Sequence, residues 1–159
     1  MLKADALRAV VMDRIPWLKE NPDQLMICVR KGNVVAAGMP AASFEYRYTL
    51  ELLVMDYPGD LDELSIAILA WANKHQPDLI FNSDRRTQGI AFEADILSTD
   101  CADILFSMTT TDAVKVEKDS AGRLTPHPKD EPDYSAIMGN ENRSWDAVFD
   151  GEMVSGASA

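Results

Sequence analysis

The sequence has few of the residues on which metal sites and disulfide frameworks depend. Its 159 residues include two cysteines and two histidines. Cys28 and Cys101 are far apart, which indicates buried thiols in a reducing compartment and leaves a disulfide between them as the alternative. His75 and His127 have no cysteine or histidine at ligand spacing, so the sequence predicts no zinc site.

Motifs for nucleotide binding and nucleophilic catalysis are also missing. The chain contains no G-x-S-x-G, no P-loop and no G-x-G-x-x-G. We therefore expect no catalytic residue, no metal, no cofactor and no enzymatic activity. No segment approaches the roughly 18 apolar residues of a membrane-spanning helix. Lys3, Asp5 and Arg8 stand where a signal peptide needs an apolar run, so we expect a soluble cytoplasmic protein.

Basic charge is scarce, and its distribution is uneven. The chain carries 15 Lys and Arg against 26 Asp and Glu, a net charge of −11. Residues 1–42 hold 6 basic and 4 acidic groups, a net of +2, whereas residues 43–159 hold 9 and 22, a net of −13. So acidic a surface argues against tight binding of phosphate backbones, although DNA could pass nearby without sticking. The basic N-terminal part could dock an acidic surface, such as that of another copy.

The most regular pattern is an alternation of apolar and polar side chains over residues 44–54. It predicts a half-buried strand of about 40 Å, at roughly 3.3 Å per residue. Because alternation already predicts burial, we assign the aromatic side chains of this strand to the core rather than to a binding platform. The inner face carries Phe44, Tyr46, Tyr48, Leu50, Leu52 and Val54.

After a break at residues 57–59, apolar residues recur at helical spacing and predict a helix of about five turns. Asp60 is the expected N-cap, with Glu63 as its capping-box partner, and Pro77 ends the helix. The spacing favours capping over a second interpretation, a site for a divalent cation. That site would use the acidic cluster Asp56, Asp60, Asp62 and Glu63.

Shorter elements surround this centre and indicate an α+β fold. We expect a mostly antiparallel sheet with a long central strand, packed by an N-terminal helix and the central helix. The other expected elements are a helix over 3–15 ended by Pro16, a strand over 25–29, a hairpin turn at Lys31-Gly32-Asn33 returning through Val34 and Val35, a polar loop over 81–89, strands over 92–97 and 104–108, a short strand over 114–116 and a turn over 120–122.

Composition divides the chain into three parts. Residues 1–125 form a single α+β domain, and residues 126–143, rich in proline and charge, form a flexible linker or arm. Residues 144–159 comprise a C-terminal hairpin around Asp150-Gly151 and a frayed tail. Because an isolated hairpin is not stable alone, this one must dock on its own domain or on a neighbouring subunit.

Two sets of residues are candidates for contacts with partners. Arg85 and Arg86 form a basic pair in the 81–89 loop, where they could contact an acidic partner or a nucleic acid. The alternative for this pair is an ordinary solvated loop. The second set consists of the apolar residues of the C-terminal hairpin, Trp145, Phe149, Met153 and Val154.

An ordered series of short segments resembles a known family. The main segments are Ser43-Phe44-Glu45-x-Arg47-Tyr48-Thr49-Leu50, Asp56-x-x-Gly59-Asp60, Ala70-Trp71 and Gln76-Pro77-Asp78. Supporting segments are Leu2-Lys3, Asn21-Pro22-Asp23, Phe92-x-Ala94-Asp95-Ile96 and Gly151-Glu152-x-Val154-Ser155. In this order they resemble the tail completion protein R family of peduovirus (P-two-like) contractile-tailed phages and related prophages. Residues 109–143 depart from the family pattern.

The resemblance implies a structural virion protein that completes the tail and enables head–tail joining, with no catalytic residues. The order of elements is similar to that of tail terminator proteins, and analogy with contractile tails implies a hexameric ring. The implied partners are other copies of the chain, tail tube and sheath proteins, and head-side neck or connector proteins. DNA would pass through the channel without specific binding, and no membrane would be involved.

The implied location is the head-proximal end of the virion tail, after assembly in the host cytoplasm.

Two other functional classes stay open at this stage. One is a monomeric or dimeric adaptor or chaperone of tail assembly, and the other is a hydrolase with a cleft of perturbed carboxylates.

Overall fold

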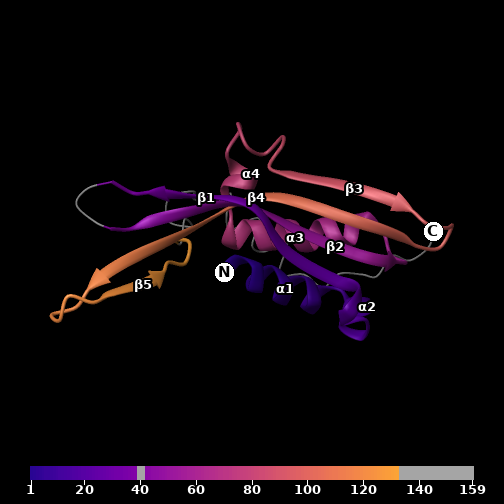
Figure 1. Ribbon diagram of the computed structural model, residues 1–159. Helices are drawn as coiled ribbons and strands as arrows, with labels where there is room; N and C mark the ends of the chain where they lie inside the picture. Colours follow the sequence, from indigo (N-terminus) through magenta and orange to yellow (C-terminus); the bar gives the residue numbers. More distant parts are fainter. Residues whose placement is uncertain (39–41, 133–159) are drawn as a thin grey trace.

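The computed structural model describes residues 1–38 and 42–132 (Figure 1). Two helices, α1 and α3, lie along one face of a single sheet. The elements in chain order are α1 (Leu2–Arg14), α2 (Pro16–Glu20), a 3-10 turn (Pro22–Gln24), β1 (Leu25–Ala36), β2 (Phe44–Tyr57), α3 (Leu61–His75), α4 (Asp78–Phe81), β3 (Ile90–Ile96), β4 (Ala102–Lys118) and β5 (Leu124–Pro128).

All strand pairs of the sheet are antiparallel, which confirms the predicted α+β class. The strand order is β1-β2-β4-β3, and β5 pairs with the distal part of β4. The central strand predicted from the alternation is β2, which lies between β1 and β4. None of the helices in the described ranges is long and apolar enough to cross a membrane.

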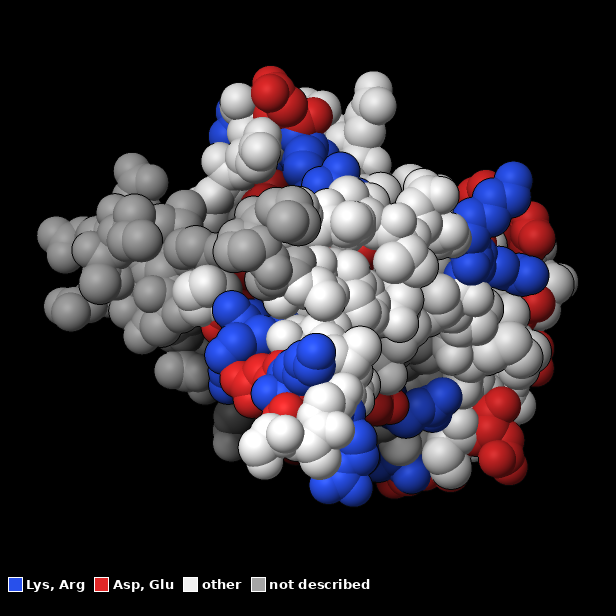
Figure 2. Space-filling view, turned by 60° about the vertical axis from the view of Figure 1, so that its left-hand side comes forward, with Lys and Arg blue, Asp and Glu red and all other residues white. Residues whose placement is uncertain are grey.

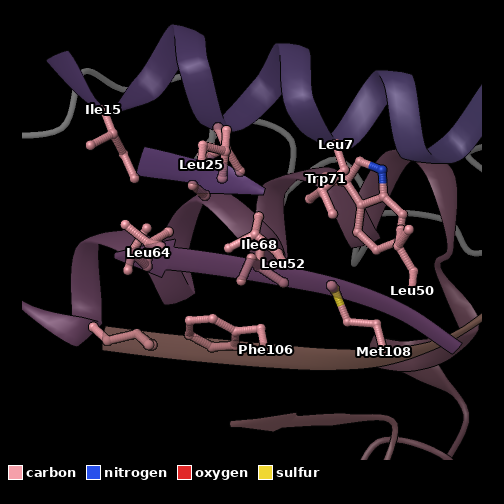
Figure 3. Close-up of a cluster of buried hydrophobic side chains, with 14 of the residues drawn as sticks. Leu7, Ile15, Leu25, Leu50, Leu52, Leu64, Ile68, Trp71, Phe106 and Met108 are labelled. Atoms are coloured by element: carbon pink, nitrogen blue, oxygen red, sulfur yellow. The ribbon is translucent and has the colours of Figure 1, made fainter. Parts of the chain in front are cut away.

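The core lies between the two helices and the middle of the sheet (Figure 3). Strand β2 contributes every second residue from Tyr48 to Val54, as its alternation predicts, and α1 and α3 contribute residues at helical spacing. The assignment of Phe44 and Tyr46 to the core is wrong, because both are only partly buried. Pro16 separates α1 from α2, as expected, and the short second helix still buries Leu18. The largest side chains enclosed here include Leu7, Val11, Leu50, Leu52, Val54, Leu64, Ile68 and Trp71.

The hairpin turn predicted at Lys31-Gly32-Asn33 is wrong, because β1 continues through it to Ala36. The strand keeps pairing with β2 and accommodates the segment with a register shift between Val29 and Gly32. A Cβ at Gly32 would lie only 2.9 Å from the Cβ of Tyr48. Glycine is therefore needed for close approach of two strands and not for a turn.

The two strands predicted over 104–108 and 114–116 are a single strand, β4. Residues 109–113 lack apolar alternation, but they pair with β2 throughout, for example Thr109 with Thr49. Thr110 and Asp112 are buried polar residues on this stretch. A long partner strand therefore extended β4 beyond what local apolar periodicity indicated.

Asp60 occupies the N-cap position of α3, as predicted, but the predicted capping box is wrong. The Asp60 side chain makes no capping hydrogen bond. The Glu63 carboxylate instead accepts a hydrogen bond from the Tyr57 hydroxyl at 2.7 Å. Tyr57 is almost fully buried, and burial together with this carboxylate raises the pKa of its phenol well above the usual range. A buried hydroxyl needs a partner, and Glu63 supplies it.

Strand β5 ends at Pro128, so residues 126–128 of the expected linker belong to the sheet. The Lys129 N–H then donates to the carbonyl of Ala113 at 2.9 Å. The remainder of the expected linker from residue 133 onward, and the whole expected hairpin over 144–159, lie outside the described residues.

Candidate interaction surfaces

A buried polar cluster joins the N-terminus to the C-terminal end of α3 and to β4. Its centre is the Gln76 side chain, which is almost fully buried. The Gln76 amide oxygen accepts from Lys3 Nζ at 2.7 Å and from the Thr111 N–H at 3.1 Å. The Gln76 amide nitrogen donates to Asp78 Oδ1 at 2.6 Å and to Thr111 Oγ1 at 3.2 Å. The amide thus uses both its donor and its acceptor groups.

The position of Gln76 follows from a gap along one edge of β4. On that side, β3 pairs with β4 as far as Met108, and β5 begins to pair only at Val114. Between them, Gly89 accepts from the Thr109 N–H, and Gln76 accepts from the Thr111 N–H. The Gln76 amide therefore takes the place of a neighbouring strand where the ladder is interrupted.

Lys3 brings a charge into this cluster. It is almost fully buried, and its Nζ contacts a Glu131 carboxylate oxygen at 2.5 Å as well as Gln76. The Lys3 carbonyl accepts from the indole N–H of Trp71 at 3.1 Å. A buried ammonium is stable only with such partners. Lys3 therefore holds the segment that leaves β5 against the N-terminal helix.

A second buried pair lies next to this cluster. The Tyr48 hydroxyl donates to Asp112 Oδ2 at 2.9 Å. Burial raises the pKa of the Asp112 carboxyl, although the Tyr48 hydrogen bond and the nearby Lys3 charge act in the opposite direction. Burial and the neighbouring carboxylate also raise the pKa of the Tyr48 phenol well above its usual range. The pair holds β2 and β4 in register.

The two arginines of the predicted basic pair, Arg85 and Arg86, have different surroundings. Arg85 donates to the Asp78 carboxylate and, at 3.1 Å, to the carbonyl of Thr109. It therefore holds the 82–89 loop against β4. Arg86 is exposed and directs its charge to solvent. The other predicted contact residues, Trp145, Phe149, Met153 and Val154, lie outside the described residues.

An open hollow of about 580 Å³ lies beside the polar cluster. Five of its nine lining residues carry a carboxylate or an amide, which suits hydrogen bonding to a partner surface of mixed character. Within the described residues, no three His, Cys, Asp or Glu side chains are placed to hold a metal ion. Both cysteines are free and partly exposed, so the alternative disulfide is not formed. The hollow is lined by Glu45, Gln76, Pro77, Asp78, Phe81, Asn82, Ser83, Thr111 and Glu131.

Apolar side chains reach the surface near both ends of β4. Near its start, Phe92, Ile96 and Leu97 are 55%, 82% and 53% exposed. Near its end lies a groove of about 370 Å³, lined by Met1, Leu2, Phe44, Tyr46, Asp112, Ala113, Val114, Pro126, Pro128 and Lys129. Alternation places Phe92 and Ile96 on one strand face, but no local sequence pattern indicates that the helices leave this face uncovered.

Comparison with known proteins gives consistent matches. The family model described as P2 phage tail completion protein R (GpR) matches residues 1–132. Tail completion protein R of Escherichia phage P2 is 33% identical over 155 residues, which cover 98% of this chain and 97% of that protein. No solved structure matches. The polar cluster and the adjacent Tyr48–Asp112 pair contain several residues from the segments that carried the resemblance in sequence, namely Lys3, Tyr48, Trp71, Gln76 and Asp78.

Proposed function

The chain belongs to the P2 phage tail completion protein R family and is a structural protein of a phage tail; from this premise we propose that it caps the tail tube and sheath and enables head–tail joining. The observation that carries the proposal is the match over nearly the full length of both chains. In this proposal the protein is not an enzyme, and it resides at the head-proximal end of the virion tail after assembly in the host cytoplasm.

We place the protein in a ring, hexameric by analogy with contractile tails. A closed ring needs a heterologous interface, in which two different surfaces of each subunit meet. Strand β3 lies at one edge of the described sheet and offers backbone groups for such contacts. The ring would also contact tail tube and sheath proteins on one side and head-side neck or connector proteins on the other.

The C-terminal residues are the proposed connection to a neighbour. Residues 144–155, with Trp145, Phe149, Met153 and Val154, would add to a neighbouring subunit or to a sheath or neck protein by strand addition. The described residues end at Pro132, next to Glu131, which pairs with Lys3. Arg86, exposed beside the structural Arg85, would contact an acidic partner surface. Deletion of residues 140–159 should therefore weaken assembly, and unchanged assembly would contradict this role.

The negative charge suits a protein near moving DNA. With a net charge of −11, part of the surface lining the channel would repel the phosphate backbone and leave DNA free to pass. A basic lumen in an assembled particle would contradict this part of the proposal.

A complementation experiment tests the proposed function. A phage with its own copy of the gene deleted should produce unjoined heads and tails, and the plasmid-borne protein should restore infectious particles. An epitope tag should then be found at the head-proximal end of finished tails by electron microscopy. A protein that restores tails but is absent from purified virions would instead be the adaptor or chaperone. Met26→Ser, at an exposed position near the start of β1, serves as the control that should complement fully.

A further inference from the structure

Strand β4 carries one hairpin at each end. Residues 97–101 connect β3 to its start, and residues 119–123 connect its end to β5. Strand β4 has 17 residues. At about 3.3 Å per residue, the two hairpins lie roughly 50 Å apart. Figure 1 shows them at opposite ends of the molecule. One subunit therefore cannot bring its own two hairpins together.

The hairpin at the start of β4 presents an apolar knob, which we define as Phe92, Ile96 and Leu97. Strand β3 pairs with β4 alone, and its outer end extends past the helices (Figure 1). The Phe92 ring lies against the ring of Phe106, with a centroid distance of 6.0 Å, yet more than half of Phe92 faces solvent. Three large apolar side chains close together in the chain and open to water indicate a contact surface.

The hairpin that carries this knob is acidic. Residues 90–103 contain Glu93, Asp95, Asp100 and Asp103, and no Lys or Arg. The local net charge is therefore −4. Three of the four, Glu93, Asp95 and Asp100, are exposed. A partner for this hairpin needs an apolar recess and a basic rim.

The opposite end of β4 offers both features. The groove defined above has a mainly apolar wall, in which the rings of Phe44 and Tyr46 meet edge to face at 5.1 Å. Leu2 also lines it and is 44% exposed. The groove contains Asp112, but that carboxylate is already hydrogen-bonded to Tyr48.

Basic side chains lie along the rim of the groove. Lys129 lines it, and three more follow on residues 115–123, where Lys115 pairs with Glu117 and Arg123 with Asp119. Figure 2 turns this end of the molecule forward and shows Lys and Arg side chains on it among Asp and Glu. The members are Lys115, Lys118, Arg123 and Lys129 against Glu117 and Asp119.

From these complementary ends we infer that the β3–β4 hairpin of one subunit docks in the groove beside the β4–β5 hairpin of a second copy. Each subunit then uses its knob on one neighbour and its groove on the other. Such a contact is heterologous and repeats around an axis until it closes. This inference rests on the proposed function, since it assigns the subunit contacts of the proposed ring.

Cysteine cross-linking in finished tails tests the docking directly. Leu97→Cys and Leu2→Cys would be combined with Cys28→Ser and Cys101→Ser, and purified tails treated with a short bismaleimide. The expected result is a ladder of cross-linked multimers on a denaturing gel. The matched control pairs Leu2→Cys with Met26→Cys, which is 49% exposed and lies at the start of β1, away from the strand positions that line the groove, and should give no ladder.

The outcomes separate the two proposals. Protein present in tails without a Leu97–Leu2 ladder, or with an equal ladder from the control pair, would overturn the docking and leave the proposed function standing. Protein absent from finished tails would overturn the proposed function itself, and the ring contact with it.

Charge reversal gives a second readout that a purely structural effect would not reproduce. Glu93→Lys with Asp95→Lys should lower the titre of complemented phage at least tenfold. Adding Lys115→Glu and Lys129→Glu to the same chain should recover most of the lost titre, because the charges of both surfaces are then reversed and attract each other again. Absence of rescue, with all variants folded by circular dichroism, would overturn the docking.

Discussion

The middle of the sheet and its two ends differ in what covers them. In the middle, α1 and α3 enclose Leu50, Leu52 and Trp71, none of which is exposed. At the ends, Ile96 and Leu124 have the same apolar character but are 82% and 64% exposed. The middle therefore carries the stability of the subunit, whereas the ends have apolar surface available for other chains.

The largest expected effect comes from breaking the covered middle. Trp71→Ala removes a fully buried indole and its hydrogen bond to the Lys3 carbonyl. We expect unfolding free energy to fall by about 3–5 kcal/mol, because a cavity remains between α3 and its neighbours. Urea unfolding followed by circular dichroism measures it. Ile66→Ala on the same helix, at a position 40% exposed, should cost much less; equal losses would contradict the comparison.

The polar cluster at the edge of this middle should give the next largest effect. Gln76→Leu leaves the Thr111 N–H and Lys3 Nζ without their shared acceptor. The expected loss is about 1–3 kcal/mol, since buried donors would be unsatisfied. Thr111→Val is the matched control, because it removes a hydroxyl but keeps the backbone N–H bond to Gln76. In the same urea assay its loss should be smaller, and the reverse order would exclude Gln76 as the centre of the cluster.

The uncovered ends should show the opposite behaviour. Ile96→Ser should change the unfolding free energy by no more than about 0.5 kcal/mol, because the side chain is already in water. The same variant should lower the titre of complemented phage, while Met26→Ser should not. A large loss of stability would show that the hairpin end belongs to the covered middle after all.

The smallest expected effect is a pH dependence that comes from Asp112. Burial raises the pKa of its carboxyl in the folded chain, so the folded state binds a proton more readily than the unfolded state. The stabilisation from that proton is present below the unfolded pKa and is lost as pH rises through the folded pKa. Wild-type stability should therefore decline gently over this window, and Asp112→Asn should remove the decline. Identical pH profiles from urea unfolding would contradict it.

The contrast between the middle and the ends also shows which features could be predicted from the sequence and which could not. Residues 44–54 and the helix beginning at Leu61 were predicted correctly, because a regular alternation or helical stripe records the side that faces the core. The turn at Lys31-Gly32-Asn33 was wrong, since a glycine that permits a turn also permits a strand to pass close to Tyr48. The predicted capping role of Glu63 was wrong, because its carboxylate accepts from the buried Tyr57 hydroxyl instead. No helix-capping pattern in the sequence indicates that pairing.

The sequence alone determined the α+β class, the long central strand, the stop at Pro16 and the family, because these depend on periodicity and on ordered residue segments. Only the tertiary structure decided which apolar faces are covered. Phe92 and Phe106 lie opposite each other on paired strands, yet one is buried and the other is 55% exposed. The reason is that burial depends on where a helix from elsewhere in the chain ends, and no local pattern contains that information.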